Sequence, residues 1–120
     1  MERILVVGLS EHRGALRFDV LASIWTRFRG LLGTTTATGR PVALIPCQSI
    51  HTVGMRYCLD VALVSRDGLV VDARRHISPG NFVSHPHAYI CLERPSVDSP
   101  WPRRGEWLAL SIKNHMRRDG

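Results

Sequence analysis

The sequence has no long apolar run. Its N-terminal apolar stretch at 4–7, Ile-Leu-Val-Val, is four residues long, and Glu-His-Arg follows at 11–13. A secretory signal needs an apolar region of about seven residues or more, and a membrane helix needs about eighteen. We therefore expect neither a signal peptide nor a membrane span.

Cysteine is scarce as well. The chain has three cysteines at irregular spacing, Cys47, Cys58 and Cys91. An odd number at such spacing does not make a disulfide framework, and free thiols are typical of reducing compartments. We therefore expect a cytoplasmic protein.

Zinc-finger spacing is also missing. Cys47 and His51 form an isolated pair four residues apart, and the His85-Pro86-His87 segment has no thiol nearby before Cys91. Structural zinc sites need closely spaced Cys and His ligands. We expect no metal site and no cofactor.

Lysine is nearly absent: the chain has fifteen arginines but a single lysine, Lys113. The formal net charge of +6 suits acidic or phosphate-bearing partners. The arginines are scattered, however, and form pairs only at 74–75, 103–104 and 117–118, without interleaved aromatics. We do not expect nucleic acid as a partner. An unknown small ligand or protein partner fits better, and the oligomeric state is left open.

The length of 120 residues suits one domain spanning 1–120. Its clearest element is a β-hairpin, in which β-branched runs at 59–64 and 69–73 flank Asp67-Gly68. Glycine readily takes the positive φ that such a tight turn needs. Further short strands are expected at 42–45, 49–53, 88–93 and 106–112.

A helix is predicted over 20–32, where apolar residues recur every three or four positions before Gly33. We expect residues 1–12 to be loosely attached, with an edge strand at 4–7, and residues 78–86 to form a loop. The combined expectation is a β-rich α+β fold. It is a small, mainly antiparallel, barrel-like domain with one short helix packed against it.

Reactive side chains are concentrated at 46–61. Cys47, His51 and Asp60 supply a thiol, a base and a carboxylate, which are the groups of a nucleophilic site. They are only weak catalytic candidates, because an extended segment puts His51 roughly 13 Å from Cys47 at about 3.3 Å per residue. In the alternative interpretation, His51 lines a polar pocket while Cys47 packs in the core.

Asp60 opens a strand rich in Val and Leu, where a bare carboxylate is costly to bury, so it needs a partner. We hypothesise that Arg27, on the predicted helix, pairs with Asp60, together with Glu93, in an ion-pair network that clamps helix to sheet. Breaking one side of such a pair costs about 3–5 kcal/mol. We prefer this structural role to a catalytic one.

A ligand-binding groove is the other candidate site. Its lining residues are His51, Thr52, Met55 and the loop around His85. They fall on predicted loops and strand ends, where binding grooves are built. The competing explanation is surface histidines beside core apolar residues.

A series of motifs runs through most of the chain. It comprises Ala22, Arg27, Gly30-Leu31-Leu32, Pro46-Cys47-Gln48-Ser49-Ile50-His51-Thr52, Met55, Leu59-Asp60-Val61, Asp67-Gly68, Pro79, Leu92-Glu93 and Gly105-Glu106. By these motifs the chain resembles the domain-of-unknown-function 192 family, also called uncharacterised protein family 127. The resemblance covers about residues 16–112, with 1–15 and 113–120 peripheral.

The resemblance implies a bacterial protein with a small β-rich barrel-like fold and one short helix. It also implies a link to pilus or secretion machinery, without an established catalytic activity. The family's motif positions are Arg27, His51, Thr52, Met55, Asp60 and Glu93, and none of them has an established catalytic role. The segment at 94–102 departs from the family pattern, since its three prolines disfavour the helix found in many relatives. Its role is therefore open.

These observations favour a binding or accessory protein without enzymatic activity. The alternative is a small hydrolase or transferase that uses Cys47 or His51 with Asp60.

Overall fold

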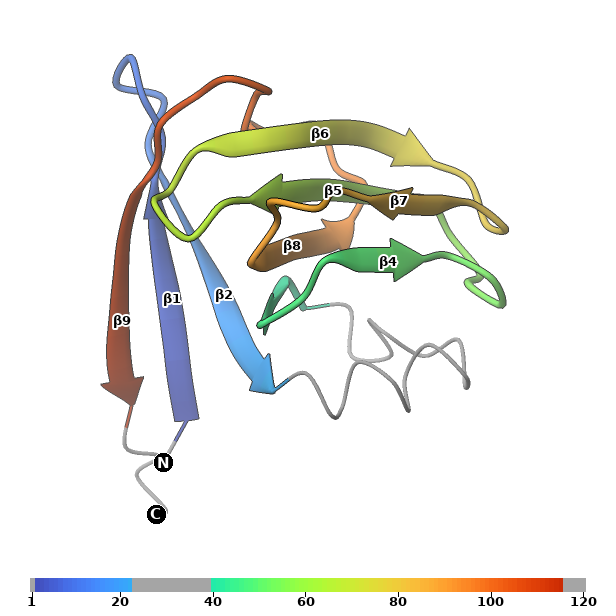
Figure 1. The fold of residues 1–120 in the computed structure, drawn as a ribbon, viewed down its shortest axis with the longest axis horizontal. Helices are drawn as coiled ribbons and strands as arrows, with labels where there is room; N and C mark the ends of the chain where they lie inside the picture. Colours follow the sequence, from blue (N-terminus) through green and yellow to red (C-terminus); the bar gives the residue numbers. More distant parts are fainter. Residues whose placement is uncertain (1, 23–39, 116–120) are drawn as a thin grey trace.

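The computed structural model describes residues 2–22 and 40–115, and all regular structure within these ranges is β (Figure 1). The strands are β1 (Glu2–Gly8), β2 (Ala15–Ala22), β3 (Val42–Ile45), β4 (Ser49–His51), β5 (Leu59–Val64), β6 (Val70–Ile77), β7 (Phe82–Ser84), β8 (Ile90–Pro95) and β9 (Ala109–His115). None of the described residues forms a helix that is long and apolar enough to cross a membrane.

Seven strands form one sheet in the order β6-β5-β8-β3-β2-β1-β9, and β4 pairs with β7 in a separate two-stranded sheet. Neighbouring strands are antiparallel, except that β2 and β3 run parallel. In Figure 1, strands β9, β1 and β2 run at a steep angle to strands β6, β5 and β8, so the large sheet is strongly bent. Because β6 and β9 remain its two edges, the described sheet is not closed into the expected barrel.

Two apolar cores lie on opposite faces of the central strands. The alternation of side chains along a strand puts Leu59, Val61 and Leu63 of β5 in one core, and Ala62 and Val64 in the other. The first core is covered by β4 and β7 through Ile50, Val83 and their neighbours, and we call this side the β4–β7 face. The second contains Leu5, Val7, Phe18 and Trp101, and we call this side the Trp101 face.

The predicted hairpin is confirmed between β5 and β6. Ser65 N–H donates to the Leu69 carbonyl at 2.8 Å, and Gly68 has a φ of +97°. A Cβ atom at Gly68 would lie 3.0 Å from the Leu108 carbonyl oxygen, so both the turn and its neighbour favour glycine.

The strand expected at 4–7 is confirmed as part of β1, but its expected place at a sheet edge and its loose attachment were wrong. Residues 2–8 form β1, which lies between β2 and β9 rather than at a sheet edge, and Leu5 and Val7 are fully buried. Local sequence reveals a strand but not its partners, and the partner β9 comes about a hundred residues later.

The predicted helix at 20–32 overlaps β2, so its first three residues are extended instead. Its remainder, with Arg27, lies outside the described residues. The missed signal for β2 is the alternation of Leu16, Phe18 and Val20 with Arg17 and Asp19.

Strand boundaries shift elsewhere. The expected loop at 78–86 contains the short strand β7, and the last strand begins at Ala109 rather than at 106. Strand β8 reaches Pro95, two residues beyond the expected end of the strand at 93. Pro95 is the terminal residue of β8, where the missing N–H group is tolerated.

Candidate functional site

Asp60 is the centre of a buried polar network on the Trp101 face. Its Oδ2 accepts hydrogen bonds from Arg94 Nε at 3.0 Å and Arg75 Nη2 at 3.3 Å. Its Oδ1 accepts from Ser96 Oγ at 2.7 Å and from the His76 backbone N–H at 3.2 Å. The carboxylate therefore has four donors although it is fully buried. Burial raises the pKa of Asp60, but the donors, led by Ser96 and Arg94, outweigh burial and lower that pKa below its ordinary value.

The backbone creates this arrangement. Asp60 lies directly opposite Arg94 on β8, so their side chains share one face. On the other side, the register of β5 and β6 shifts between Leu59 and Val61, which leaves Arg75 and His76 opposite Asp60 alone. His76 has a φ of 56° in this bulge. The bulge turns the His76 N–H and the Arg75 side chain toward the same carboxylate.

Ser96, His76 and Asp60 have the composition of a hydrolase triad but not its hydrogen bonding. The Ser96 hydroxyl donates its single hydrogen bond to Asp60, so the Ser96 oxygen is left to accept a hydrogen bond from His76 Nδ1, 2.6 Å away. A nucleophilic serine instead donates to the histidine. This contact positions Ser96 and does not activate it.

Arg94 is held on its second side by Trp101. Its guanidinium carbon lies 4.5 Å from the centre of the Trp101 ring, and its Nη2 donates to the Ser99 carbonyl at 2.8 Å. The Trp101 indole in turn donates to the Val61 carbonyl at 3.1 Å and packs edge-on against Phe18. The Pro-rich segment is thus anchored to the sheet at Trp101.

Glu106 organises the adjoining loops in the same way. Its carboxylate accepts hydrogen bonds from the backbone and hydroxyl of Ser10, both at 2.7 Å, and from the Arg103 N–H at 2.9 Å. It also forms an ion pair with Arg13. Burial raises the pKa of Glu106, but these donors outweigh burial and lower the pKa to about 2. Glu106 therefore joins the β1–β2 turn to the segment before β9.

The β1–β2 turn has an unusual backbone. Glu11 and His12 have φ values of 57° and 56°, a left-handed conformation that costs non-glycine residues about 1 kcal/mol or more each. The turn is closed by a hydrogen bond from Arg13 N to the Ser10 carbonyl at 3.2 Å. It brings Ser10 and Arg13 to Glu106 together, so the contact with Glu106 offsets the strain.

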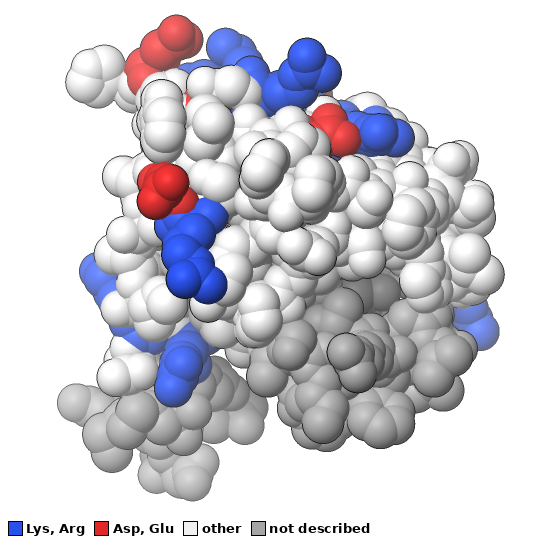
Figure 2. All heavy atoms as spheres, in the orientation of Figure 1, with Lys and Arg blue, Asp and Glu red and all other residues white. Residues whose placement is uncertain are grey.

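These two networks flank a pocket of about 400 Å³. Its lining residues are Arg13, Ala73, Arg75, Pro100, Trp101, Pro102, Arg103 and Arg104. Figure 2 shows basic side chains, with acidic ones among them, along the upper edge of the molecule, where the β1–β2 tip and β6 lie in Figure 1, whereas the region over β4 and β7 is nearly uncharged. The pocket is strongly basic.

Two of the pocket arginines are fixed in place from behind. Asp60 holds Arg75, whose Nη2 also donates to the Val97 carbonyl at 2.5 Å. Glu106 holds Arg13, whose Nη1 donates to the Trp101 carbonyl at 3.0 Å. The Nε of Arg13 is buried and has no hydrogen-bond partner among residues 2–22 and 40–115. Such an arrangement suits binding of an anion. The lining residues supply neither a nucleophile nor a general base.

The structure does not bring Cys47, His51 and Asp60 together. Cys47 belongs to the core of the β4–β7 face, and Asp60 is on the Trp101 face. His51 is paired with Phe82 on the side of β4 that faces away from buried Ile50. Its Nδ1 is buried and has no hydrogen-bond partner within the described ranges.

Two of the four residues of the predicted ligand groove are buried. Met55 is buried in the β4–β7 core, and Thr52 is fully buried. The Thr52 hydroxyl donates to the Ser78 carbonyl at 2.9 Å and accepts from Asn81 N at 2.8 Å. His85 follows β7 beside Gln48, three residues along the pair from the His51–Phe82 position, or roughly 10 Å at about 3.3 Å per residue.

Cys47 has a different partner from the one expected. Its thiol donates to the Ser49 carbonyl at 3.1 Å, and its sulfur accepts a hydrogen bond from Cys91. That bond from Cys91 lowers the pKa of Cys47, although burial opposes the shift. The same contact, with burial, raises the pKa of Cys91. All three cysteines are free thiols.

The predicted ion-pair network is placed only in part. Asp60 has its cationic partners, but they are Arg94 and Arg75. Glu93 is fully buried opposite Val61, which puts it on the β4–β7 face, away from Asp60. Arg27 lies outside the described residues, so its role stays a prediction.

Sequence reasoning missed most of the pocket. Arg94 was not predicted as a partner of Asp60, because its place opposite Asp60 depends on the pairing of β5 with β8. The segment at 94–102 was the strongest signal, since its departure from the family pattern coincides with the pocket wall. No local pattern marks Ser10 or Arg13. Among residues 2–22 and 40–115, no group of three or more His, Cys, Asp or Glu side chains is placed to hold a metal ion.

No protein-family model and no curated protein matches the chain. Two solved structures have a similar fold. One is a "putative transcription regulator" from Sinorhizobium meliloti 1021, which is 14% identical, with a TM-score of 0.61 over 91% of this chain and 92% of that chain. The other is a protein of unknown function from Novosphingobium aromaticivorans DSM 12444, also 14% identical, with a TM-score of 0.61 over 88% and 84%. At this identity the likeness shows the fold alone, and the family resemblance stays a prediction.

Proposed function

We propose that the protein is a binding module that takes a small anionic ligand in the arginine-lined pocket. One observation carries the proposal: four arginines line a single pocket, and buried carboxylates hold two of them from behind. An arginine side chain loses about 2 kcal/mol of rotamer entropy when it is fixed. Because folding has already immobilised Arg13 and Arg75, a ligand gains their hydrogen bonds at a lower entropic cost.

The geometry favours this function over the hydrolase or transferase alternative. Cys47 and Asp60 lie on opposite faces, and the Cys47 sulfur is bonded to Ser49 and Cys91. A nucleophile, its base and an orienting group need hydrogen-bond contact with each other. These residues do not provide that contact.

The distribution of charge supports a small ligand over a nucleic acid. Four of the eleven described arginines line one pocket, whereas a phosphate backbone is bound along an extended basic surface. The free thiols support the cytoplasmic prediction. A link to pilus or secretion machinery rests on the family resemblance and remains a prediction.

The test is an NMR titration with phenyl phosphate, an anion with an apolar ring. We expect shifts of the Trp101 indole and of the guanidinium Nε–H signals of pocket arginines. The double variant Arg75→Gln/Arg104→Gln should weaken binding at least tenfold. The matched control is Arg3→Gln/Arg17→Gln, which removes the same charge from exposed positions on β1 and β2.

Binding in the control should stay within about twofold of the parent protein. An equal loss in both double variants would mean that net charge, and not the pocket, attracts the anion. Arg104→Gln alone provides a check against misfolding, because Arg104 is exposed and lies outside the Asp60 and Glu106 networks.

A further inference from the structure

The charge of the pocket identifies the class of anion, and this inference rests on the proposed function. The four lining arginines contribute four positive charges, and buried Arg94 contributes a fifth. The ionised carboxylates of Asp60 and Glu106 cancel two of them. Glu11, 3.7 Å from Arg103, cancels one more. Two positive charges are left without a counter-charge.

The location of this excess is also defined. Arg75 and Arg94 share the single carboxylate of Asp60, so one positive charge belongs to that cluster. The other belongs to Arg104, which forms no ion pair among the described residues. Both Arg75 and Arg104 line the pocket, so the two uncompensated charges border the same space. A ligand with two negative charges on one group neutralises both.

The size and lining of the pocket add a second requirement. Its volume of about 400 Å³ lies within the range of small-molecule pockets, roughly 300–1,000 Å³. An inorganic anion of five heavy atoms leaves most of this space to water, at about 30 Å³ per water molecule. The wall includes Ala73, Pro100, Trp101 and Pro102, which offer apolar contact. The ligand therefore has an organic part beside its charged group.

We propose that the pocket binds a phosphate monoester of a small organic molecule. A phosphate monoester has close to two negative charges at neutral pH and three terminal oxygens that accept hydrogen bonds. Guanidinium groups bind such oxygens in pairs. A phosphodiester or a sulfate ester of the same shape has one charge, and a dicarboxylate spreads its two charges over separate groups.

The pH dependence of binding distinguishes a change in the charge of the ligand from a change in the charge of the protein. Phosphate monoesters lose their second charge below about pH 6, whereas arginines stay charged throughout. Asp60 and Glu106 stay ionised, since hydrogen-bond donors lower the pKa of each. Further acidic groups close in sequence to the pocket residues or their partners are Glu11, Asp72 and Asp98, of which Glu11 and Asp98 are exposed. Two imidazole groups, those of His12 and His76, are next in sequence to Arg13 and Arg75.

The experiment compares phenyl phosphate, phenyl sulfate and phthalate by NMR titration of the full chain between pH 7.5 and pH 5. The first two probes have the same shape and differ in charge, and phthalate has two separate carboxylates. At pH 7.5 we expect phenyl phosphate to bind at least tenfold more tightly than phenyl sulfate. The ratio should shrink toward unity at pH 5, and Arg104→Gln should reduce it at pH 7.5.

Each of the other outcomes contradicts one part of the proposal. Equal binding of phosphate and sulfate, with loss of both in Arg75→Gln/Arg104→Gln, contradicts the dianion and leaves the proposed function standing. Phthalate binding as tight as phenyl phosphate contradicts the monoester class. Absence of binding by all three probes contradicts the proposed function itself.

Discussion

The two faces of the central strands use buried polar groups in opposite ways. On the β4–β7 face, Thr52 is fully buried, and its hydroxyl forms hydrogen bonds with the backbone of the loop at 78–81. On the Trp101 face, Asp60 and Glu106 each hold an arginine that also reaches a pocket. Cys47 and Thr52 of the reactive stretch at 46–61 therefore lie on the face where polar groups serve packing. Asp60 and the proposed binding pocket lie on the other.

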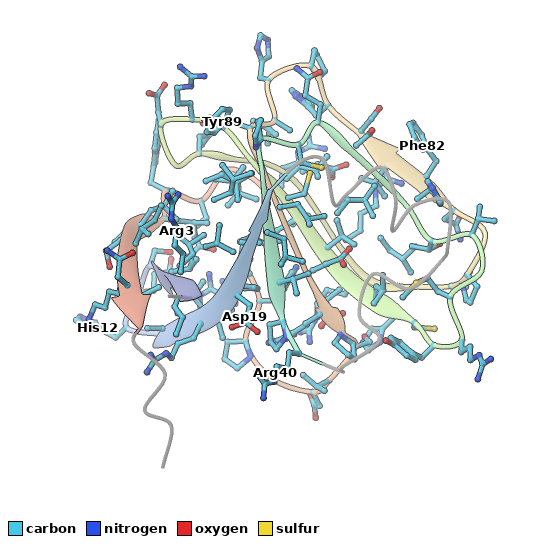
Figure 3. The ribbon with its side chains drawn as sticks, turned by 90° about the horizontal axis from the view of Figure 1, so that it is seen from below. Arg3, His12, Asp19, Arg40, Phe82 and Tyr89 are labelled. Carbon is cyan, nitrogen blue, oxygen red and sulfur yellow. The ribbon has the colours of Figure 1, made fainter. Side chains whose placement is uncertain are left out.

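The view from below supports this contrast. In Figure 3, Phe82 on β7 lies at the outer rim of the molecule, on the opposite side from His12 in the β1–β2 turn. Phe82 is 62% exposed, and Val53 in the adjoining turn is 58% exposed, so the β4–β7 side presents apolar groups to solvent. The turn that contains His12 instead delivers Arg13 to the pocket.

The largest effect is expected from Asp60→Asn. The variant keeps the shape but leaves Arg94 buried without its counter-charge, so unfolding free energy should fall by about 3–5 kcal/mol. Urea denaturation at pH 7 measures this loss. The control is Asp19→Asn, whose carboxylate is 39% exposed and 3.9 Å from Arg40, with an expected change below about 0.5 kcal/mol. Similar losses in the two variants would contradict the network.

The variant Glu106→Gln tests the second buried carboxylate through the stability of the protein at acidic pH. Its pKa of about 2 lies below the ordinary value near 4.3, so it contributes roughly 3 kcal/mol of stability above that value. A depressed pKa means that this contribution is lost as pH falls from about 4.5 to about 2. Unfolding measured across that window should be less pH-dependent in Glu106→Gln than in the parent protein.

Glu11→Gln is the matched control for this experiment, because the Glu11 side chain is 75% exposed. Its pH profile should follow that of the parent protein. If Glu106→Gln keeps the full acid transition, another carboxylate is responsible for it.

Thr52→Val probes the β4–β7 face. The change keeps the shape but leaves Asn81 N and the Ser78 carbonyl without their hydroxyl partner, at a cost of about 1–3 kcal/mol. Amide hydrogen exchange should increase at 78–81. The affinity for phenyl phosphate should not change, since the pocket is on the opposite face, and a tenfold weaker affinity would contradict the separation of the two faces.

Individual strands and turns could be predicted from the sequence better than the contacts between them. The β5–β6 hairpin was recognisable because an Asp-Gly turn and its flanking apolar runs are contiguous, and Asp60 was correctly expected to need cationic partners. Those partners were not recognisable locally. Arg75 reaches Asp60 through a bulge, and Arg13 joins Glu106 across 93 residues of sequence. The first contact depends on the bulge and the second on the packing of two distant loops, and neither is visible in a short stretch of sequence.

The smallest effect should come from Cys47, and it tests whether the two faces act independently. The hydrogen bond from Cys91 lowers the pKa of Cys47, so alkylation by iodoacetamide should reach half its maximal rate at a lower pH than for an ordinary free thiol. Cys91 is fully buried and should stay unlabelled until the protein unfolds. Cys91→Ala removes the donor and should move the Cys47 midpoint upward; an unchanged midpoint would contradict the thiol contact.

Because Cys47 and the pocket lie on opposite faces, alkylated protein should bind phenyl phosphate within twofold of the untreated protein. A larger loss would show that the two cores are coupled through the central strands.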